Sequence, residues 1–159
     1  MSSTIVFVRH AHRDKPIPDD NNGLSPKGFE QTEDLVKAYK QGEIPPSKIF
    51  WSSPKIRCQQ TLKPICDEAS GTYKVEPLLD ERLADEKSAS YNGRIAKFIE
   101  KAIAEHAETI YLCSHGDILP EAIEYLTDHF VEVKKGQAVV LVQDKAKNKW
   151  RITKTFPKA

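Results

Sequence analysis

The sequence predicts an α/β protein of three layers, α/β/α, with a mostly parallel central sheet and antiparallel strands at one edge. Three observations favour this fold class. Short apolar runs, typical of strands buried on both faces, alternate with amphipathic segments of helical length. Proline and glycine separate many of these segments. The last two strand-like runs follow each other without a helix between them, which is typical of a closing hairpin.

The first strand and the first helix are expected on either side of a polar loop. Residues 5–8 are a continuous apolar run, which suits a strand that is buried on both faces. Charged residues and prolines fill 9–23, as is typical of a loop. Ser25 before Pro26 has the form of a helix N-cap with proline at the first helical position. The apolar spacing continues that helix to about residue 40.

A second strand and helix repeat this arrangement. The strand is expected at 48–51, and Ser53 before Pro54 again has the form of a cap with a proline start. Apolar positions from 56 to 69 then trace a helix. A short strand is expected near Val75.

The second half of the chain supplies the remaining elements. Irregular backbone is expected from 77 to 90, and the clearest helical stripe of apolar residues then predicts a helix over about 92–108. A third buried strand is expected at 109–113. The last elements are a helix that carries Ile118, Leu119, Ile123 and Leu126, and a hairpin of 138–142 and 149–155.

Length, charge and composition narrow the class of protein. The 159 residues suit one domain, 1–159, that buries its core without disulfides. A net charge of +1 argues against nucleic acid as a partner. No apolar run approaches the roughly 18 residues of a membrane span, and the N-terminal residues lack the pattern of a signal peptide. We therefore expect a cytoplasmic protein, a monomer or weak oligomer, with no membrane partner.

Charged side chains follow three of the predicted strands. Arg9 and His10 come directly after the first strand. Arg57 lies one turn into the helix after the second strand, and His115 follows the strand at 109–113. Mostly parallel sheets bind their ligands beyond the carboxyl ends of the strands, where arginine side chains and helix N-termini can hold phosphate. The sequence therefore predicts a site for a dianion, phosphate above all.

Five motifs stand in order along the chain. They are Val8-Arg9-His10-Ala11, Leu24 to Gln31, Ser52 to Thr61 with Arg57, Leu79-Asp80-Glu81-Arg82, and Cys113-Ser114-His115-Gly116. Together they resemble the motifs of the histidine phosphatase superfamily, also called phosphoglycerate mutase-like. The resemblance covers residues 5 to about 120 and is specific, whereas a single Arg-His pair is not. It implies the phosphoglycerate mutase-like fold and a phosphatase that acts on a phosphorylated small molecule or a phosphoprotein.

The same resemblance implies a role for each matching residue. His10 would be the nucleophile that forms a covalent phosphohistidine, and Glu81 would be the proton donor. Arg9, Arg57 and His115 would hold the phosphoryl oxygens. His115 would thereby have a catalytic role in addition to binding phosphate. Because the arginines neutralise the phosphate, no metal or other cofactor is expected. Neighbouring cations would keep His10 deprotonated and therefore nucleophilic.

Departures from the family pattern favour hydrolysis over mutase chemistry. Ala11 stands where the family usually has glycine, and in this respect the sequence resembles small phosphohistidine phosphatases. The interval from Glu81 to His115 is short, and only Phe156 to Ala159 follow the last strand, so neither a capping subdomain nor a closing tail is expected. An open pocket admits water to a phosphoenzyme. Arg-His-Ala favours a phosphohistidine substrate, whereas Glu81 favours a phosphomonoester, and the sequence leaves this choice open.

Alternative interpretations remain for the same residues. Glu81 lies in an acidic stretch, where a solvated charge is as reasonable as a catalytic one. Ser53 and Asp117 are interpreted as helix caps, and His12 as a loop residue at the mouth of the pocket. A second hypothesis is a metal-dependent hydrolase that uses His10 and His12, with His115 and Asp117 completing the site. A third is a non-catalytic module that binds a phosphorylated ligand on the same fold.

Overall fold

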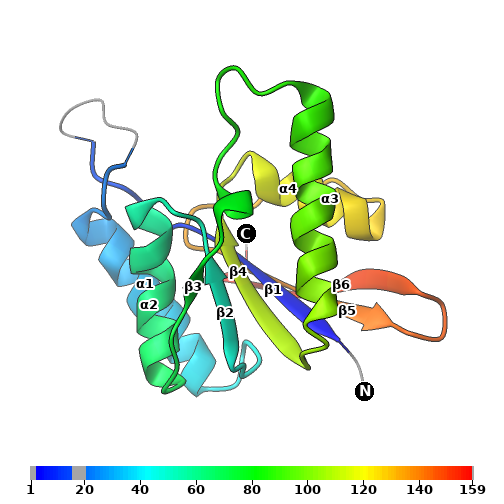
Figure 1. The fold of residues 1–159 in the computed structure, drawn as a ribbon. Coiled ribbons are helices and arrows are strands. Elements are labelled where there is room, and N and C mark those ends of the chain that lie inside the picture. The colour runs from blue at the N-terminus through cyan, green and yellow to red at the C-terminus, as the bar shows by residue number, and fades with distance from the viewer. Residues whose placement is uncertain (1–2, 16–20, 159) are drawn as a thin grey trace.

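The computed structural model describes residues 3–15 and 21–158, which form a six-stranded sheet with helices on both faces (Figure 1). The strands are β1 (Thr4–Arg9), β2 (Ile49–Ser52), β3 (Lys74–Val75), β4 (Thr109–Ser114), β5 (Ala138–Asp144) and β6 (Lys149–Phe156). The helices are α1 (Pro26–Lys40), α2 (Ile56–Glu68), α3 (Ser88–Ala104) and α4 (Ile118–Thr127), with a short 3₁₀ helix, η1 (Pro77–Leu79).

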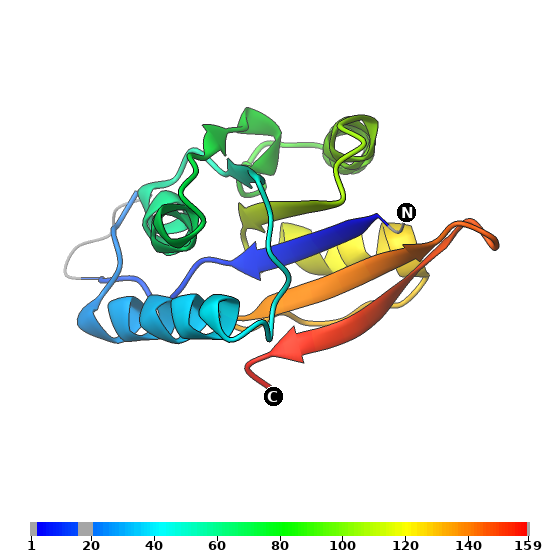
Figure 2. The same cartoon turned by 90° about the horizontal axis from the view of Figure 1, so that it is seen from below.

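The sheet has the order β3-β2-β4-β1-β5-β6. Strands β1 to β4 are mutually parallel, whereas β5 runs antiparallel to β1 and pairs with β6 as a hairpin. Figure 2 gives a second view, in which α1 and α2 lie toward one side of the sheet and α3 and α4 toward the other. The predicted three-layer fold, its mostly parallel sheet and its antiparallel edge are therefore confirmed.

The register of the parallel strands aligns their carboxyl ends. Arg9 of β1 lies opposite Ser114 of β4, and Ser52 of β2 lies opposite Cys113 of β4. The residues that follow these three strands must therefore leave the sheet at the same edge, as parallel pairing requires. This edge is the one at which ligands bind in such folds.

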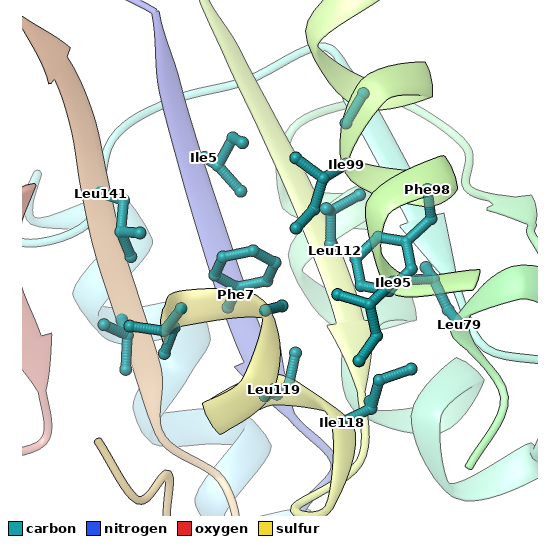
Figure 3. Close-up of a cluster of buried hydrophobic side chains, with 14 of the residues drawn as sticks. Ile5, Phe7, Leu79, Ile95, Phe98, Ile99, Leu112, Ile118, Leu119 and Leu141 are labelled. Carbon is teal, nitrogen blue, oxygen red and sulfur yellow. The ribbon is translucent and has the colours of Figure 1, made fainter. Parts of the chain in front are cut away.

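Two hydrophobic layers hold the strands in this register. Along β1, Ile5 and Phe7 pack with side chains of α3 and α4, while Val6 and Val8 pack with α1 and α2. All four side chains are almost completely buried. Figure 3 shows the first layer, in which Phe7 lies among residues of β4, α3 and α4. Because side chains alternate along a strand, one apolar run supplies both layers.

Several boundaries differ from the sequence-based expectation. Helix α3 begins at Ser88 and ends at Ala104, about four residues earlier than the apolar stripe indicates. The stretch expected to be irregular contains η1, where the Glu76 side chain accepts a hydrogen bond from Leu78 N. Ser25 caps α1 as predicted, since its hydroxyl accepts from Gly28 N at 3.1 Å. Residues 16–20 of the predicted first loop lie outside the described residues.

In the ranges that the structure describes, no helix has both the length and the apolar character needed to cross a membrane. The three cysteines, Cys58, Cys66 and Cys113, are free and buried.

Candidate active site

The strand ends bring two histidines together. His10 follows β1 and His115 follows β4, and both side chains are at least 95 % buried. Their ring centroids lie 5.4 Å apart with the planes tilted by 59°. Since β1 and β4 are hydrogen-bonded neighbours, this proximity follows from the strand register. The predicted convergence of these two residues is present in the structure.

His10 is held in one tautomer. Its Nδ1 lies 2.9 Å from the carbonyl oxygen of Ala11, and a carbonyl only accepts, so Nδ1 carries the proton. The lone pair of Nε2 is therefore available for reaction. The backbone of this turn is fixed in its own right, because Ala11 N donates to Thr61 Oγ1 of α2 at 2.9 Å.

Burial also keeps His10 neutral. It lowers the pKa of His10 to about 3, and the charges of Arg57, Arg9 and Arg13 lower it as well, while the hydrogen bond to Ala11 acts in the opposite direction. At neutral pH the imidazole therefore carries no positive charge. A neutral ring with an available nitrogen is the form required of a nucleophile.

His115 is fixed through its other nitrogen. Its Nε2 lies 2.8 Å from Ser53 Oγ and 3.6 Å from Cys58 Sγ. Nδ1 is buried, has no hydrogen-bond partner among the described residues, and lies 4.0 Å from Glu81 Oε2. Burial lowers the pKa of His115 to about 2, and the charge of Arg57 adds to this effect. A buried polar nitrogen of this kind can bind a ligand atom.

Two arginines supply the positive charge of the site. Arg57, in the first turn of α2, is 1 % exposed and donates from Nη2 to Glu81 Oε2 at 2.8 Å. Arg9 donates from Nη1 to the carbonyl of Val133 at 2.9 Å, and its buried Nε has no hydrogen-bond partner in the described part of the chain. Burial lowers the pKa of Arg9, against the attraction of Asp117 and Glu132.

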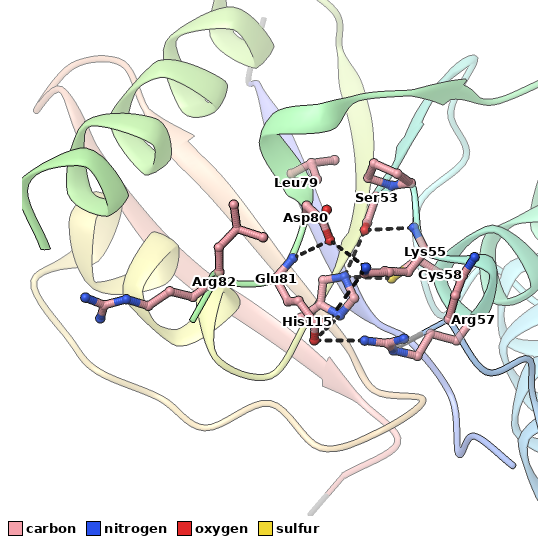
Figure 4. A network of polar contacts seen from close by, with 12 residues as sticks. Ser53, Lys55, Arg57, Cys58, Leu79, Asp80, Glu81, Arg82 and His115 are labelled. Atoms are coloured by element: carbon pink, nitrogen blue, oxygen red, sulfur yellow. Dashed lines mark hydrogen bonds and ion pairs between the residues drawn. The ribbon is translucent and has the colours of Figure 1, made fainter. Parts of the chain in front are cut away.

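Glu81 lies within the site, as Figure 4 shows. Its carboxylate accepts from Arg57 and lies 4.0 Å from Lys55 Nζ, and its side chain is one-third exposed. Its backbone is held on both sides, since Glu81 N donates to Asp80 Oδ1 at 2.8 Å and Glu81 O accepts from Arg94 at 3.3 Å. The alternative of a charge that is merely solvated therefore does not describe its position.

Ser53 and Asp117 differ from their expected roles. Lys55, not Ser53, occupies the N-cap position of α2, and the Ser53 hydroxyl contacts His115. Asp117 is at the N-cap position of α4 but makes no capping hydrogen bond, and instead accepts from Arg82 N at 3.0 Å. Ser53 directly follows β2. The expectation that ligands bind beyond the carboxyl ends of the strands therefore identifies Ser53 too, if serine is considered as well as charged residues.

The metal hypothesis finds no support in the geometry. Across residues 3–15 and 21–158, no three His, Cys, Asp or Glu side chains are grouped so that they could hold a metal ion. His12 Nδ1 lies 2.6 Å from Ser25 Oγ, while His10 and His115 face each other and Arg57. Apart from the Glu81 carboxylate, the polar groups of the site are cations and neutral imidazoles, which suit an anion.

Comparisons with known proteins agree with this geometry. Residues 5–86 match the family model of the histidine phosphatase superfamily (branch 1). A curated relative, the 8-oxo-(d)GTP phosphatase of Mycolicibacterium smegmatis, is 28% identical over 130 residues, which are 78% of this chain and 37% of the relative. The match thus spans little more than a third of that protein.

Solved structures show the same fold. The alpha-ribazole phosphatase from Shigella flexneri superposes with a TM-score of 0.77 at 14% identity, with 94% of each chain covered. The protein histidine phosphatase SixA complexed with tungstate gives a TM-score of 0.76 at 14% identity, covering 96% of this chain and 95% of that one. With a family model that matches more than half of its residues, the chain belongs to the histidine phosphatase superfamily.

Gly116 offers a test of the position of Arg9. A Cβ atom at Gly116 would meet the Arg9 guanidinium, with Nε at 2.7 Å, so Gly116→Ala should displace this side chain. We expect the affinity for inorganic phosphate to fall by about tenfold, which corresponds to about 1.4 kcal/mol, when measured by titration calorimetry. Gly93→Ala is the control, because a Cβ there meets no atom within 4 Å. Equal affinities of the two variants would contradict the assignment of Arg9.

The two buried histidines should make stability depend on pH. Their pKa values, about 3 for His10 and about 2 for His115, lie below the value near 6.5 expected in the unfolded chain. As pH falls below 6.5, the unfolded chain takes up protons that the folded protein does not, so the free energy of unfolding decreases. Each histidine adds at most about 1.4 kcal/mol per pH unit to this decrease. Urea denaturation at several pH values should show a shallower decrease in His115→Asn; an unchanged slope would refute the buried neutral state.

Proposed function

We propose that the protein is a metal-independent phosphatase that uses His10 Nε2 as a nucleophile and forms a covalent phosphohistidine. The observation that carries this proposal is the state of His10. It is buried, neutral and fixed by its Nδ1 hydrogen bond to Ala11, while Arg57, Arg9 and His115 lie around it. Such a group attacks phosphorus without first losing a proton.

In the first step, His10 Nε2 attacks the phosphorus atom in line with the leaving group. The Nε2–P bond forms as the bond from phosphorus to the leaving oxygen or nitrogen breaks. Arg57 and Arg9 stabilise the negative charge on the equatorial oxygens, which is the main requirement of phosphoryl transfer. In the second step, water attacks the phosphohistidine, inorganic phosphate leaves, and His10 returns to its neutral state.

Ser53 would prepare His115 for the same anion. If the Ser53 hydroxyl donates to His115 Nε2, the ring proton of His115 is on Nδ1, the nitrogen without a partner in the described residues. That N–H group would then donate to a phosphoryl oxygen. The contact with Ser53 is consistent with this direction, because Ser53 Oγ also accepts from Lys55 N at 3.3 Å and so keeps its proton for His115.

Glu81 would move the protons of both steps. A substrate that binds as its monoanion would bring the proton, which Glu81 would pass to the leaving oxygen as general acid; the Glu81 carboxylate would later accept a proton from the attacking water as general base. Its carboxylate accepts from Arg57 at 2.8 Å, and an incoming phosphate would compete for that guanidinium and release Glu81 for proton transfer. An alkoxide leaving group requires this proton more than an imidazole or aryloxide does.

Family membership supports phosphatase activity and leaves the substrate open. The relatives are an 8-oxo-(d)GTP phosphatase, an alpha-ribazole phosphatase and a protein histidine phosphatase, which differ widely in what they act on. We infer that the substrate is a phosphorylated small molecule or a phosphoprotein, and that residues 1–159 act as one domain. Glu81 in the site favours a phosphomonoester.

His10→Ala should abolish turnover. We expect kcat/KM for p-nitrophenyl phosphate to fall by at least about a thousandfold, because no other group can form the covalent intermediate. The wild-type protein should also yield an acid-labile, base-stable phosphate on His10 after rapid quenching. His129→Ala is the control, since His129 is exposed and far from these motifs in the sequence. Turnover that survives in His10→Ala would refute the nucleophile, and a wild-type protein that binds phosphate without turnover would favour the non-catalytic module.

Glu81→Gln should separate substrates by their leaving groups. We expect butyl phosphate hydrolysis to slow by about a hundredfold or more, as is typical when a general acid is lost, and p-nitrophenyl phosphate hydrolysis to slow far less. Asp85→Asn is the matched control in the same acidic stretch, because this side chain is exposed. If the hydrolysis of both substrates slowed equally, Glu81 would only bind or position the substrate and would not be the proton donor.

A further inference from the structure

A second cationic cavity lies beside the proposed active site. It has a volume of about 540 Å³, which is in the range of small-molecule sites. The basic residues that line it are Arg9, His12, Lys27, Lys134, Lys135 and Lys158. The other lining residues are Gln31, Gln137 and Pro157, so the lining contains no carboxylate.

Three separate segments enclose this cavity together with residues 9–12, at the end of β1 and just after it, and hydrogen bonds fix these parts of the chain to one another. The first is α1, whose Gln31 accepts from His12 N at 2.8 Å. The second precedes β5, where Gly136 N contacts the carbonyls of Arg9 and His10, each at 3.2 Å. The third follows β6, where the carbonyl of Pro157 accepts from Gln137 Nε2 at 2.9 Å. These hydrogen bonds fix the backbone segments that carry the basic side chains of the cavity.

Gly136 permits the close approach of two of these segments. Its φ of +74° lies in the left-handed region that favours glycine. A Cβ atom there would approach Gln31 of α1 to 3.0 Å. The lysines at 134 and 135 are thereby held next to the first turns of α1, which carry Lys27.

The lysines of the cavity lack acidic partners in the part of the chain that the structure describes. None of these four lysines forms an ion pair with a carboxylate within residues 3–15 and 21–158. Burial lowers the pKa of Lys135, and the neighbouring charges of Lys15, Arg9, Arg13 and Lys27 lower it further. A concentration of like charge in a concave site is unfavourable by itself and becomes favourable when an anion binds.

Arg9 connects this cavity to the proposed active site. It lines the cavity, and its charge also acts on both His10 and His115. Arg9 therefore takes part in both places, and an anionic group at the histidines and another in the cavity would both lie near this residue. His12, two residues beyond the nucleophile, lines the cavity as well.

We propose that this cavity binds a second phosphate group of the substrate, so that the enzyme prefers small molecules with two phosphate groups joined by a short linker. The proposal rests on the phosphatase function proposed above and extends it to the class of substrate. The concave shape and limited volume favour a small molecule over the acidic surface of a protein. The four lysines favour phosphate, which they bind as point charges.

Substrates with matched leaving groups test this preference. Three substrates have an alkoxide leaving group in common: butyl phosphate, 1,4-butanediol bisphosphate and 1,6-hexanediol bisphosphate. Only the last two carry a second phosphate, and they differ in the length of the linker between the two phosphates. We expect kcat/KM for one of the bisphosphates to exceed that for butyl phosphate by about tenfold, after correction for its two equivalent ends, mainly through a lower KM. Equal values for all three substrates would overturn the proposal.

A pair of double variants assigns the preference to the cavity. Lys27→Gln with Lys135→Gln should reduce the ratio of kcat/KM between bisphosphate and butyl phosphate by about tenfold. Lys145→Gln with Lys147→Gln removes the same charge from exposed positions in the turn between β5 and β6, and should leave the ratio unchanged. A ratio that stays unchanged in the first double variant, or falls equally in both, would overturn the proposal.

Binding measurements separate this proposal from the proposed catalysis. Titration calorimetry of His10→Ala should show bisphosphate binding about tenfold tighter than butyl phosphate, and the added lysine substitutions should remove the difference. If this holds while the wild-type protein hydrolyses neither compound, the phosphatase function fails and the cavity assignment stands. If hydrolysis proceeds without any preference, the cavity assignment fails alone. A lysine-dependent preference for an acidic phosphoprotein over every bisphosphate would also overturn it.

Discussion

The parallel pairing of β1 with β4 is the constraint on which the site depends. With Arg9 opposite Ser114, the next residue of each strand is a histidine, and the two rings come within 5.4 Å. A shift of this register by one residue would move the side chains of β1 to the opposite face and separate the histidines. The hydrophobic layers on both faces of the sheet oppose such a shift, because each face accepts only its own set of side chains. The packing of the core therefore fixes the positions of the two histidines relative to each other.

Burial gives the charged and neutral groups of this edge different properties. Burial lowers the pKa of both imidazoles, so they are neutral, whereas the Arg57 guanidinium, at 1 % exposure, supplies positive charge beside them. Within the protein, Arg57 is paired with the carboxylate of Glu81. The result is a neutral imidazole in a strongly positive environment, with one carboxylate at its border. The proposed phosphate site depends on this arrangement, because a bound anion would take the place of the carboxylate at the arginine.

Much of the fold and part of the site follow from local sequence patterns. The apolar run at 5–8 and the cap formed by Ser25 lead to the first strand and helix, since both patterns act within a few residues. Other elements depend on distant contacts. Ser53 has the local form of a cap, yet its hydroxyl contacts His115, 62 residues away, and α2 begins without it. The start of α3 at Ser88 has no apolar signal, because its first turn is largely exposed.

From the sequence alone, the alternation of strands and helices could be predicted, as could the meeting of Arg9, His10, Arg57 and His115 at one edge of the sheet, because strand ends and charged side chains are visible residue by residue. Only the tertiary structure decided that Glu81 pairs with Arg57, that His10 donates to Ala11, and that lysines from three segments surround one cavity. These are contacts between side chains and backbone of separate elements. Their geometry depends on how whole layers pack, and no local pattern of residues encodes it.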